Sequence, residues 1–331
     1  MKSIISLGEV LVDIIPSSPL QLGAACYSPH AGGAPANVAV AIARLGGSSR
    51  FLGTVSDDEF GRLLVQVLID NHVDVNYIRT LTEAPTAIAL VTLSADGQRH
   101  FTFFRQGTAD MLLQTEYVNW SAWDDAAICH TGGVLLSDEP ARSATLAAMD
   151  HTHQIGSIVS FDVNARPALW TSSAVLRDMM TKTVERTDIL KLSADECEFV
   201  DSQSSLPITP SEKSRLNALG RALLEKGPSL VIITRGPLGA LLLTEKHQID
   251  VPAMSVRPVD TTGAGDAFMG AVLSQLVQLG CSTPSDLRAL SVEDLNQLGH
   301  FANQVAGLSS TRYGGISSFP FLQDINSASS S

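Results

Sequence analysis

Residues 260–268 read DTTGAGDAF, and this stretch decides the interpretation of the whole chain. Its centre, Gly263-Ala264-Gly265, leaves the backbone bare directly before an apolar segment with helical character up to residue 279. The first N–H groups of a helix have no intrahelical partner, and the helix dipole adds partial positive charge at that end. The stretch therefore predicts an anion-binding helix N-terminus, for which a phosphate group is the obvious guest.

A carboxylate follows these glycines directly. Asp266 puts a negative charge where a site for phosphate alone would have none. One interpretation is structural, because Asp favours the first turn of a helix. The other is that Asp266 faces a second substrate and accepts a proton from a hydroxyl that attacks phosphorus. The helix N-terminus is expected to lower the pKa of this carboxyl, and phosphoryl transfer tolerates such a weak base because the hydroxyl loses its proton late.

Composition excludes several classes of function. The chain has 331 residues, of which 44% are hydrophobic, so it can bury the core of one large domain. Its net charge of -12 argues against a nucleic-acid partner, which needs a basic face. No apolar run reaches the length of a membrane span, and Gly8, Glu9 and Asp13 break the N-terminal run, so we expect a cytoplasmic protein. Four widely separated cysteines without metal-site spacing predict free buried thiols.

Hydrophobic patterns alternate between strands and helices along most of the chain. Runs rich in β-branched residues predict strands at 3–8, 10–15, 50–55, 126–131, 157–162, 188–193, 230–234 and 239–244. Helical patterns cover 32–47, 60–73, 139–153, 172–186, 194–200, 212–227, 266–279 and 292–309. Ser56 and Glu59 form a capping-box pattern before the second helix. The alternation predicts a largely parallel sheet with helices on both faces and ligands at the carboxyl ends of its strands.

A hairpin interrupts this alternation. Residues 86–94 and 98–105 are apolar and aromatic runs that flank Asp96-Gly97, a strong turn signal. Together with the N-terminal strands they predict a small antiparallel flap, formed from about 10–31 and 84–108, on a single domain that spans 1–322. A polar loop is expected at 201–211, and residues 323–331 read as a disordered tail.

Two familiar phosphate-binding motifs are absent from the sequence. There is no G-x-x-x-x-G-K-[ST] and no G-x-G-x-x-G that opens a βαβ unit, so neither a P-loop nor a dinucleotide fold explains the anion site. A second glycine motif, AGGAPANVAVAIARLGG at 31–47, begins a helix with Pro35 near its first turn. The chain therefore carries two glycine motifs, one near each end.

These two motifs resemble the signatures of the ribokinase-like sugar kinases, the PfkB family. DTTGAGDAF looks like the C-terminal signature, and AGGAPANVAVAIARLGG looks like the N-terminal motif in the variant typical of fructokinases. Their order and the elements between them also fit, so the resemblance covers the chain to about residue 320. It implies a Rossmann-like α/β domain with a β-sheet lid, which phosphorylates a sugar hydroxyl with ATP and Mg²⁺.

The resemblance assigns roles position by position. Asp266 matches the catalytic base, and the amides of Gly263, Ala264 and Gly265 match an anion hole that stabilises charge on the transferred phosphoryl group. The positions that match substrate contacts are Asp13, Gly32, Gly33, Asn37, Arg105 and Arg166. Without the family, each of these positions has an ordinary interpretation. Asp13 and Arg105 would be exposed strand residues, Arg166 would form a surface salt bridge, and the remaining positions would belong to a glycine turn before a helix.

Further positions match the nucleotide and metal side of the family site. They are Ser193, Glu196, Thr234, Gly236, Gly239 and Asn303, of which Glu196 supports Mg²⁺ and phosphate through water. Ser193 replaces an Asn of the family, which leaves the detail of the Mg²⁺ network open. Asp260 and Thr262 lie where many members bind K⁺ through carbonyl oxygens. The alternative for these positions is an ordinary turn or helix residue.

The predicted function is an ATP-dependent kinase that makes fructose 6-phosphate, working as a homodimer because the edges of a flap need covering. Within the family, a 2-keto-3-deoxygluconate kinase or a nucleoside kinase is the alternative. Phe103 and Phe104 favour fructose, because a substrate with a carboxylate would want more cationic or tyrosine contacts near Arg105. An alternative of another class is a non-catalytic sugar or nucleotide sensor, against which the presence of Asp266 speaks.

Overall fold

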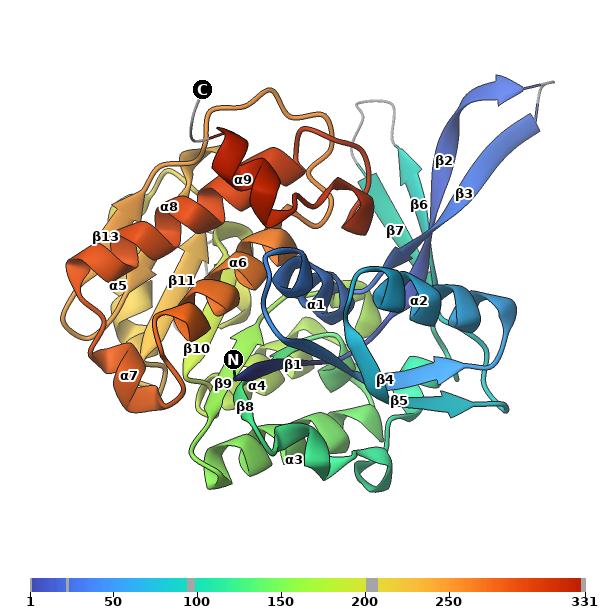
Figure 1. Ribbon diagram of the computed structural model, residues 1–331, viewed down its shortest axis with the longest axis horizontal. Helices are drawn as coiled ribbons and strands as arrows, with labels where there is room; N and C mark the ends of the chain where they lie inside the picture. The colour runs from blue at the N-terminus through green and yellow to red at the C-terminus, as the bar shows by residue number, and fades with distance from the viewer. Residues whose placement is uncertain (1, 22–23, 94–98, 201–207, 329–331) are drawn as a thin grey trace.

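Two separate β-sheets, with helices around the larger one, make up the structure (Figure 1). The computed structural model describes residues 2–21, 24–93, 99–200 and 208–328. Helices cover the larger sheet, and the smaller sheet projects from one side of this body. The prediction of a mostly parallel α/β domain with a separate small sheet is confirmed.

The larger sheet has the strand order β13-β12-β11-β10-β9-β8-β1-β4-β5. Its strands are β1 (Ser3–Leu7), β4 (Ser49–Ser56), β5 (Asp74–Leu81), β8 (Ala126–Gly132), β9 (Ile158–Asp162), β10 (Ile189–Ser193), β11 (Leu230–Thr234), β12 (Ala240–Leu243) and β13 (Gln248–Val251). All pairings from β5 to β11 are parallel, and β12 and β13 add an antiparallel edge. The strand order reverses between β1 and β8, and ligands bind beside such a reversal, at the carboxyl ends of the strands.

Helices cover both faces of this sheet. One layer contains α1 (Ala34–Arg44), α2 (Glu59–Asp70), α6 (Ala264–Gln278) and α8 (Val292–Ser309). The other contains α3 (Ala141–Gln154), α4 (Ser173–Val184) and α5 (Lys213–Leu224). Strand β11 shows why both layers are needed: Ile232 packs into the core on the α6 side, and Val231 and Ile233 pack into the core under α4 and α5. A strand buried on both faces is a continuous apolar run, as LVIIT is.

Helices α1 and α6 run side by side in the same direction. They approach closely at Ala41 and Gly270, where a Cβ on Gly270 would lie 2.5 Å from the Cβ of Ala41. One turn earlier on each helix, Asn37 and Asp266 are within hydrogen-bonding distance of each other. The absence of a side chain at Gly270 therefore sets the distance between the two glycine motifs.

The smaller sheet, called the lid below, has the order β3-β2-β6-β7. Its strands are β2 (Leu11–Gln21), β3 (Ala24–Gly32), β6 (Ile88–Leu93) and β7 (Arg99–Phe104). The pairs β2–β3 and β6–β7 are antiparallel hairpins, but β2 and β6 pair in parallel. The expectation of an antiparallel flap is thus wrong at its centre, because both strands run outward from the larger domain (Figure 1). The predicted turn at Asp96-Gly97 lies outside the described residues.

Some elements differ from the sequence prediction. Helix α2 has Asp58 as its N-cap, and not Ser56, because the Asp58 carboxylate accepts the N–H of Gly61 at 2.7 Å. The half-exposed β5 and the edge strand β13 lack the apolar runs on which the strand predictions depend. The segment 194–200 is mainly a 3-10 helix, a short α7 (Pro284–Arg288) precedes α8, and residues 201–207 of the predicted loop lie outside the described residues.

The predicted disordered tail from residue 323 is wrong for most of its length. Residues Leu322–Ala328 form α9, because Ile325 inserts into the core and is only 2% exposed. Residues 329–331 lie outside the described residues. A polar composition alone therefore misreads this segment, whose single buried apolar side chain fixes it.

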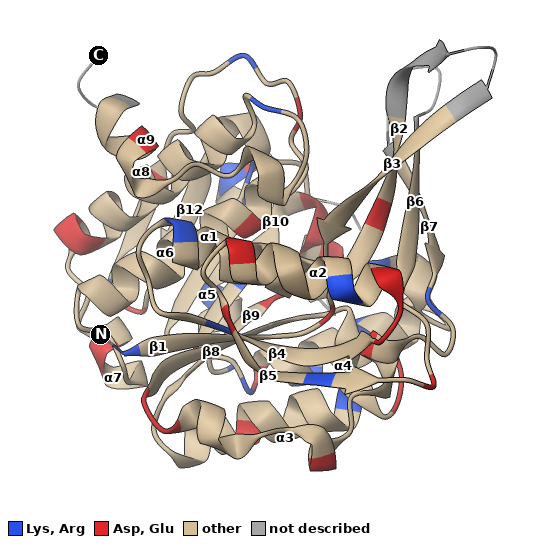
Figure 2. Ribbon diagram, turned by 45° about the vertical axis from the view of Figure 1, so that its right-hand side comes forward, with Lys and Arg blue, Asp and Glu red and all other residues tan. Residues whose placement is uncertain are grey.

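None of the four cysteines forms a disulfide in the described part of the chain, as their spacing predicts. Cys129, Cys197 and Cys281 are buried, but the prediction of a buried thiol is wrong for Cys26, which is exposed. In the described part of the chain, no helix has the length and apolar character needed to cross a membrane. Figure 2 shows Lys and Arg dispersed among Asp and Glu in that view.

Candidate active site

Polar side chains from several segments converge at the carboxyl ends of β9 and β10. Asp162 ends β9, Lys191 lies on β10, and the loop after β9 carries Arg166. Asp266 and Asn37 come from the first turns of α6 and α1. The charges of Asp162, Lys191 and Arg166 all act on the Asp266 carboxyl, which places them around one group. This is the edge at which a parallel sheet opens toward a ligand.

The carboxylate of Asp266 is held by an amide from another helix. Asn37 Nδ2 donates a hydrogen bond to Asp266 Oδ2 at 2.7 Å. Asn37 is buried, and its Oδ1 has no partner in the part of the chain that the structure describes. The amide oxygen can therefore accept a hydrogen bond from a ligand hydroxyl. The two glycine motifs, far apart in sequence, form one site.

The glycine turn before α6 has a backbone shape that favours glycine. Gly263 is the N-cap of α6 with a φ of 73°, in the left-handed region, and a Cβ there would lie 3.0 Å from the ring of Phe319. Of the three amides predicted for the anion hole, the N–H of Ala264 is already bound by the carbonyl of Thr261 at 3.2 Å. The N–H of Gly265 has no acceptor among the described residues, so it remains available to an anion.

Burial raises the pKa of Asp266 from its ordinary value of 3.8 to about 6. The hydrogen bond from Asn37 opposes this effect, the negative charge of Asp162 adds to it, and the positive charges of Lys191 and Arg166 oppose it. The expected lowering by the helix N-terminus is therefore wrong, because lost hydration outweighs the helix dipole. A carboxylate with this pKa is a stronger base that is still mostly ionised at pH 7.

Asp13 lies on the lid strand β2 and faces the glycine turn before α1. A Cβ on Gly32 would collide with Asp13 Oδ2. A Cβ on Gly33, whose φ is 104°, would collide with the carbonyl oxygen of Glu9. Both glycines are therefore needed for this turn to lie against the Asp13 carboxylate. The Asp13 carboxylate and the glycine turn therefore form a polar surface where the lid meets the larger domain. Asn37 follows this turn on the first turn of α1.

Glu9 is a buried carboxyl group beside this turn that no motif singles out. It is 2% exposed, and its Oε1 accepts the N–H of Ala34, the first residue of α1, at 3.2 Å. Its Oε2 is buried without a partner within the described ranges. Burial raises the pKa of Glu9 to about 7, and the charge of Arg105 only partly opposes this. An acid inside the apolar run at 3–15 is the sequence signal that could have found it.

Glu9→Gln should remove a pH dependence of stability. The folded protein keeps a proton on Glu9 up to about pH 7, whereas the unfolded chain loses it near pH 4.5. The contribution of this group to stability is thus fully present below pH 4.5 and is lost as pH rises to about 7. Between about pH 5 and 7.5, the free energy of unfolding of the wild type should fall by about 2 kcal/mol more than that of the variant.

Urea unfolding of both proteins at the two pH values measures this difference. Glu225→Gln, at an exposed carboxyl remote from the site, is the matched control and should follow the wild type. Equal pH dependence in wild type and Glu9→Gln would contradict a protonated, buried Glu9.

Arg105 is buried, so the alternative of an exposed strand arginine is wrong. Its side chain is 4% exposed, and its Nε donates to Asp110 Oδ2 at 2.5 Å. Nη1 donates to the carbonyl of Val134 at 3.3 Å, while Nη2 is buried with no partner among the residues described. The guanidinium acts on Glu9 electrostatically. Arg105 therefore keeps one donor available near the polar surface at the foot of the lid.

Glu196 fixes the loop that carries Arg166. Its Oε1 accepts the N–H of Ala165 and its Oε2 accepts the N–H of Ser193, both at 2.8 Å. Ser193 and Glu196 form a capping box at the start of a 3-10 helix. Asn164 in the same loop has a φ of 35°, and such strained backbone is concentrated at functional sites. The half-buried Arg166 is thereby held near Asp266.

A cavity of about 550 Å³ lies beside the glycine turn of α6. The predicted nucleotide-side residues that line it are Thr234, Gly236, Gly239 and Asn303. Its apolar wall is formed by Ala253, Met254, Val256, Pro258, Phe268 and Ala306. Asn303 Nδ2 donates to the carbonyls of Val251 and Pro252 at 3.1 and 2.9 Å, so its amide donors hold the wall in place. Gly265 lines the same cavity, so the cavity ends at the candidate anion site.

Asp260 stabilises the loop before α6. Its Oδ1 accepts the N–H and the hydroxyl of Thr262 at 2.9 and 2.8 Å, and its Oδ2 accepts the N–H of Gly314 at 2.8 Å. Within the described residues, no group of three or more His, Cys, Asp and Glu side chains is arranged to hold a metal ion. The Asp260 carboxylate ties the loop at Gly314 to the segment that leads into α6.

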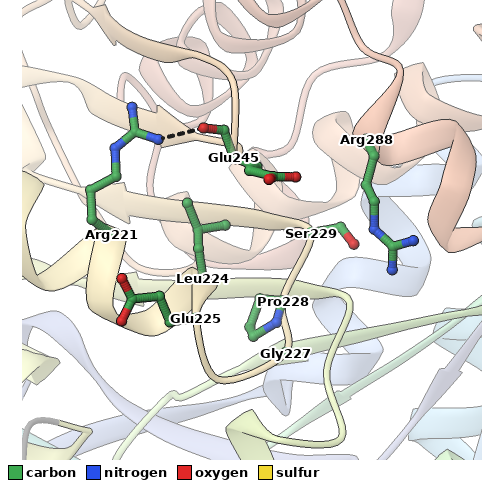
Figure 3. Close-up of a pocket in the computed structure, with 8 residues that line it drawn as sticks. All are labelled: Arg221, Leu224, Glu225, Gly227, Pro228, Ser229, Glu245 and Arg288. Atoms are coloured by element: carbon green, nitrogen blue, oxygen red, sulfur yellow. Dashed lines mark hydrogen bonds between the residues drawn. The ribbon is translucent and has the colours of Figure 1, made fainter.

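A second hollow, of about 370 Å³, lies where β11 begins and β12 ends (Figure 3). This is the edge of the sheet away from the carboxyl ends of the parallel strands. The polar residues that line the hollow are Arg221, Glu225, Ser229, Glu245 and Arg288. Arg221 Nη1 donates to the carbonyls of Thr244 and Glu245, so it anchors the end of β12. The hollow combines both charge signs and lacks a glycine turn at a helix N-terminus, so we do not assign the chemistry to it.

Known proteins are similar in sequence to this chain over nearly its whole length. The family profile described as pfkB family carbohydrate kinase matches residues 1–322. Fructokinase-1 of Oryza sativa subsp. japonica is 39% identical over 319 residues, which are 96% of this chain and 94% of that relative.

Solved structures extend the similarity to three dimensions. A fructokinase from Xylella fastidiosa with bound ATP matches with a TM-score of 0.87 at 30% identity, over 98% of this chain and 97% of that one. A double mutant of the fructokinase from Vibrio cholerae O395, with fructose, ADP and a potassium ion bound, matches with a TM-score of 0.82 at 30% identity, over 99% and 98% of the two chains.

Proposed function

The chain belongs to the pfkB family of carbohydrate kinases, and we propose that it is a fructokinase, which transfers the terminal phosphoryl group of ATP to the primary hydroxyl of fructose. The position of Asp266 carries this proposal. Its carboxylate is bound to Asn37 beside the glycine turn, with the apolar cavity ending at the same turn. The relatives support the two substrates, since one solved fructokinase holds ATP and another holds fructose with ADP.

In the proposed reaction each side chain of the site has a role. Asp13 and Asn37 orient the hydroxyl groups of fructose, and Arg105 offers its remaining guanidinium donor. Asp266 accepts the proton of the hydroxyl that attacks phosphorus. The free amide of Gly265 and the charge of Arg166 stabilise the phosphoryl group during transfer. The lid excludes water, which otherwise competes for the phosphoryl group.

Cations and assembly belong to the same proposal. Mg²⁺ would reach Glu196 and Ser193 through water, and when bound it would neutralise charge on the phosphates. K⁺ would bind carbonyl oxygens of the loop that Asp260 and Thr262 form, and a potassium ion in the Vibrio fructokinase supports this. The edge strands of the lid, β3 and β7, support a homodimer formed through the lid. The cytoplasmic location stays a prediction.

A substrate panel tests the proposed function. Purified protein with ATP and Mg²⁺ should phosphorylate fructose with a kcat/KM at least about tenfold above that for ribose, adenosine or 2-keto-3-deoxygluconate. A preference for one of the other three would replace fructose as the substrate. Binding of fructose and ATP without turnover of any of the four would favour the non-catalytic sensor.

The pH dependence of kcat/KM for fructose should report Asp266. Because the pKa of this carboxyl is raised to about 6, activity should fall about tenfold per pH unit below that value. An unperturbed carboxyl would keep nearly full activity down to about pH 5. The measurement is kcat/KM from about pH 4.5 to 8, with each sample returned to pH 7.5 to show that the enzyme has not unfolded. A flat profile down to pH 4.5 would exclude Asp266 as the titrating base.

A further inference from the structure

Two opposite charges are buried together at the carboxyl ends of β9 and β10. Lys191 and Asp162 are register partners on these neighbouring strands, with Nζ 2.7 Å from Oδ2. Their side chains are 8% and 3% exposed. A buried ion pair rarely adds stability, because the loss of hydration offsets the attraction between the charges. A pair in this position therefore requires an explanation other than stability.

The ammonium group of Lys191 lies against the first turn of α6. A Cβ on Gly265 would lie 3.2 Å from Nζ, so this glycine leaves the space beside the ammonium open. Among the residues that the structure describes, Asp162 is the one hydrogen-bond partner of Nζ, which has three N–H donors. Lys191 thus keeps donors at the same turn that offers the Gly265 amide.

Four groups from four different segments affect the charge of Asp266. These groups are Asn37 from α1, Asp162 from β9, Arg166 from the loop after β9 and Lys191 from β10. Burial alone would lower the pKa of Lys191, but the carboxylates of Asp162 and Glu196 raise it, so the ammonium stays charged. Asp162 Oδ1 is buried and has no partner within the described ranges. No hydrogen bond among the described residues therefore compensates for the lost hydration of this oxygen.

We propose that Lys191 and Asp162 are positioning residues of the phosphoryl-transfer site: Asp162 holds the Lys191 ammonium beside the first turn of α6, where it balances the negative charge of Asp266 and of the entering phosphate. This inference rests on the proposed kinase function. Asp162 fixes a long, flexible side chain in one place and limits the positive charge that Asp266 experiences. The two residues therefore act on Asp266 in opposite directions.

Removal of each charge separately tests the proposal, because the expected shifts have opposite signs. In Lys191→Met an attraction for ionised Asp266 is lost, so the acid limb of kcat/KM should move up by about one pH unit and kcat should fall about 10²-fold. In Asp162→Asn a repulsion is lost, so the limb should move down by about one pH unit. KM for fructose should change by less than about threefold in both. Lys191→Arg keeps the charge and should keep the limb near that of the wild type.

A single variant keeps one unpaired buried charge and could fail to fold for that reason. In that case the double variant Lys191→Met/Asp162→Asn tests the proposed role of the pair. It should fold, keep the acid limb close to that of the wild type, and still lose about 10²-fold in kcat. Wild-type kcat in the double variant would overturn the inference. Single variants whose limbs move together, or not at all, would overturn it as well.

A readout without turnover separates this inference from the proposed function. The carboxyl carbon of Asp266, assigned by its absence from the NMR spectrum of Asp266→Asn, should titrate with the same two opposite shifts. If the wild type does not phosphorylate fructose, the proposed function fails, and this titration still shows whether Lys191 and Asp162 act on Asp266. Unchanged titration in both variants would overturn the inference alone.

Discussion

Asp266→Asn should lower kcat for fructose by about 10²–10⁴-fold while the Kd for fructose changes by less than about threefold. The variant keeps the shape of the side chain, and the carboxamide oxygen can still accept the Asn37 Nδ2 hydrogen bond that is now 2.7 Å long. What is lost is the acceptor for the proton of the attacking hydroxyl, an interaction that matters only as the phosphoryl group moves. Initial rates and calorimetric fructose binding, measured on the same preparation, separate the two effects.

The matched control is Asp178→Asn, at an exposed acid on α4 whose partner is Lys182. It removes the same charge far from the site and should retain the kcat of the wild type. Turnover of Asp266→Asn within about threefold of the wild type would remove Asp266 from the proposed mechanism. A loss of fructose binding equal to the loss of kcat would instead make Asp266 a binding residue.

Gly263→Ala should lower kcat by about 10²-fold, the effect of losing a donor from an anion hole. Alanine is disfavoured at a φ of 73°, and its Cβ would lie 3.0 Å from the ring of Phe319, so backbone strain and crowding together favour a shift of the first turn of α6. A small shift there displaces the Gly265 amide and Asp266 together, relative to the phosphoryl group. Steady-state kinetics with fructose and ATP measures the loss.

Gly156→Ala separates backbone strain from damage to the site. Gly156 has a φ of 77°, like Gly263, but a Cβ there would meet nothing within 4 Å, and it lies in the turn after α3. Both variants should lose about 1 kcal/mol of stability, whereas only Gly263→Ala should lose turnover. Equal kcat values for the two variants would show that the turn at Gly263 is a structural N-cap without a catalytic part.

The glycine motifs are readable from sequence because their backbone requirements leave a residue signature. Asn37 and Asp266 stand at matching places in the first turns of two helices, and the structure joins them directly. The sequence could not tell that Asn37 would hold the carboxylate, because that bond depends on the closeness of α1 and α6. The alternation of apolar runs likewise predicts the parallel sheet. It does not predict the edge strand β13, because that strand has no apolar run.

The buried charges could not be read in the same way. Lys191, Asp162 and Glu9 interrupt apolar runs, and a sequence does not tell whether such a residue turns to solvent or is enclosed. The predicted lowering of the Asp266 pKa is wrong for a related reason. The helix N-terminus is visible in sequence, whereas the burial that outweighs it depends on neighbours from other segments.

The contact of Ala41 with Gly270 has a consequence for how relatives can diverge. Helices α1 and α6 share room for a single methyl group at this point, since a second one would lie 2.5 Å from the first. The two positions should therefore vary as a couple, with alanine on one helix matched by glycine on the other. A larger residue at either position alone would push the two helices apart, which would loosen the core and lengthen the hydrogen bond from Asn37 to Asp266.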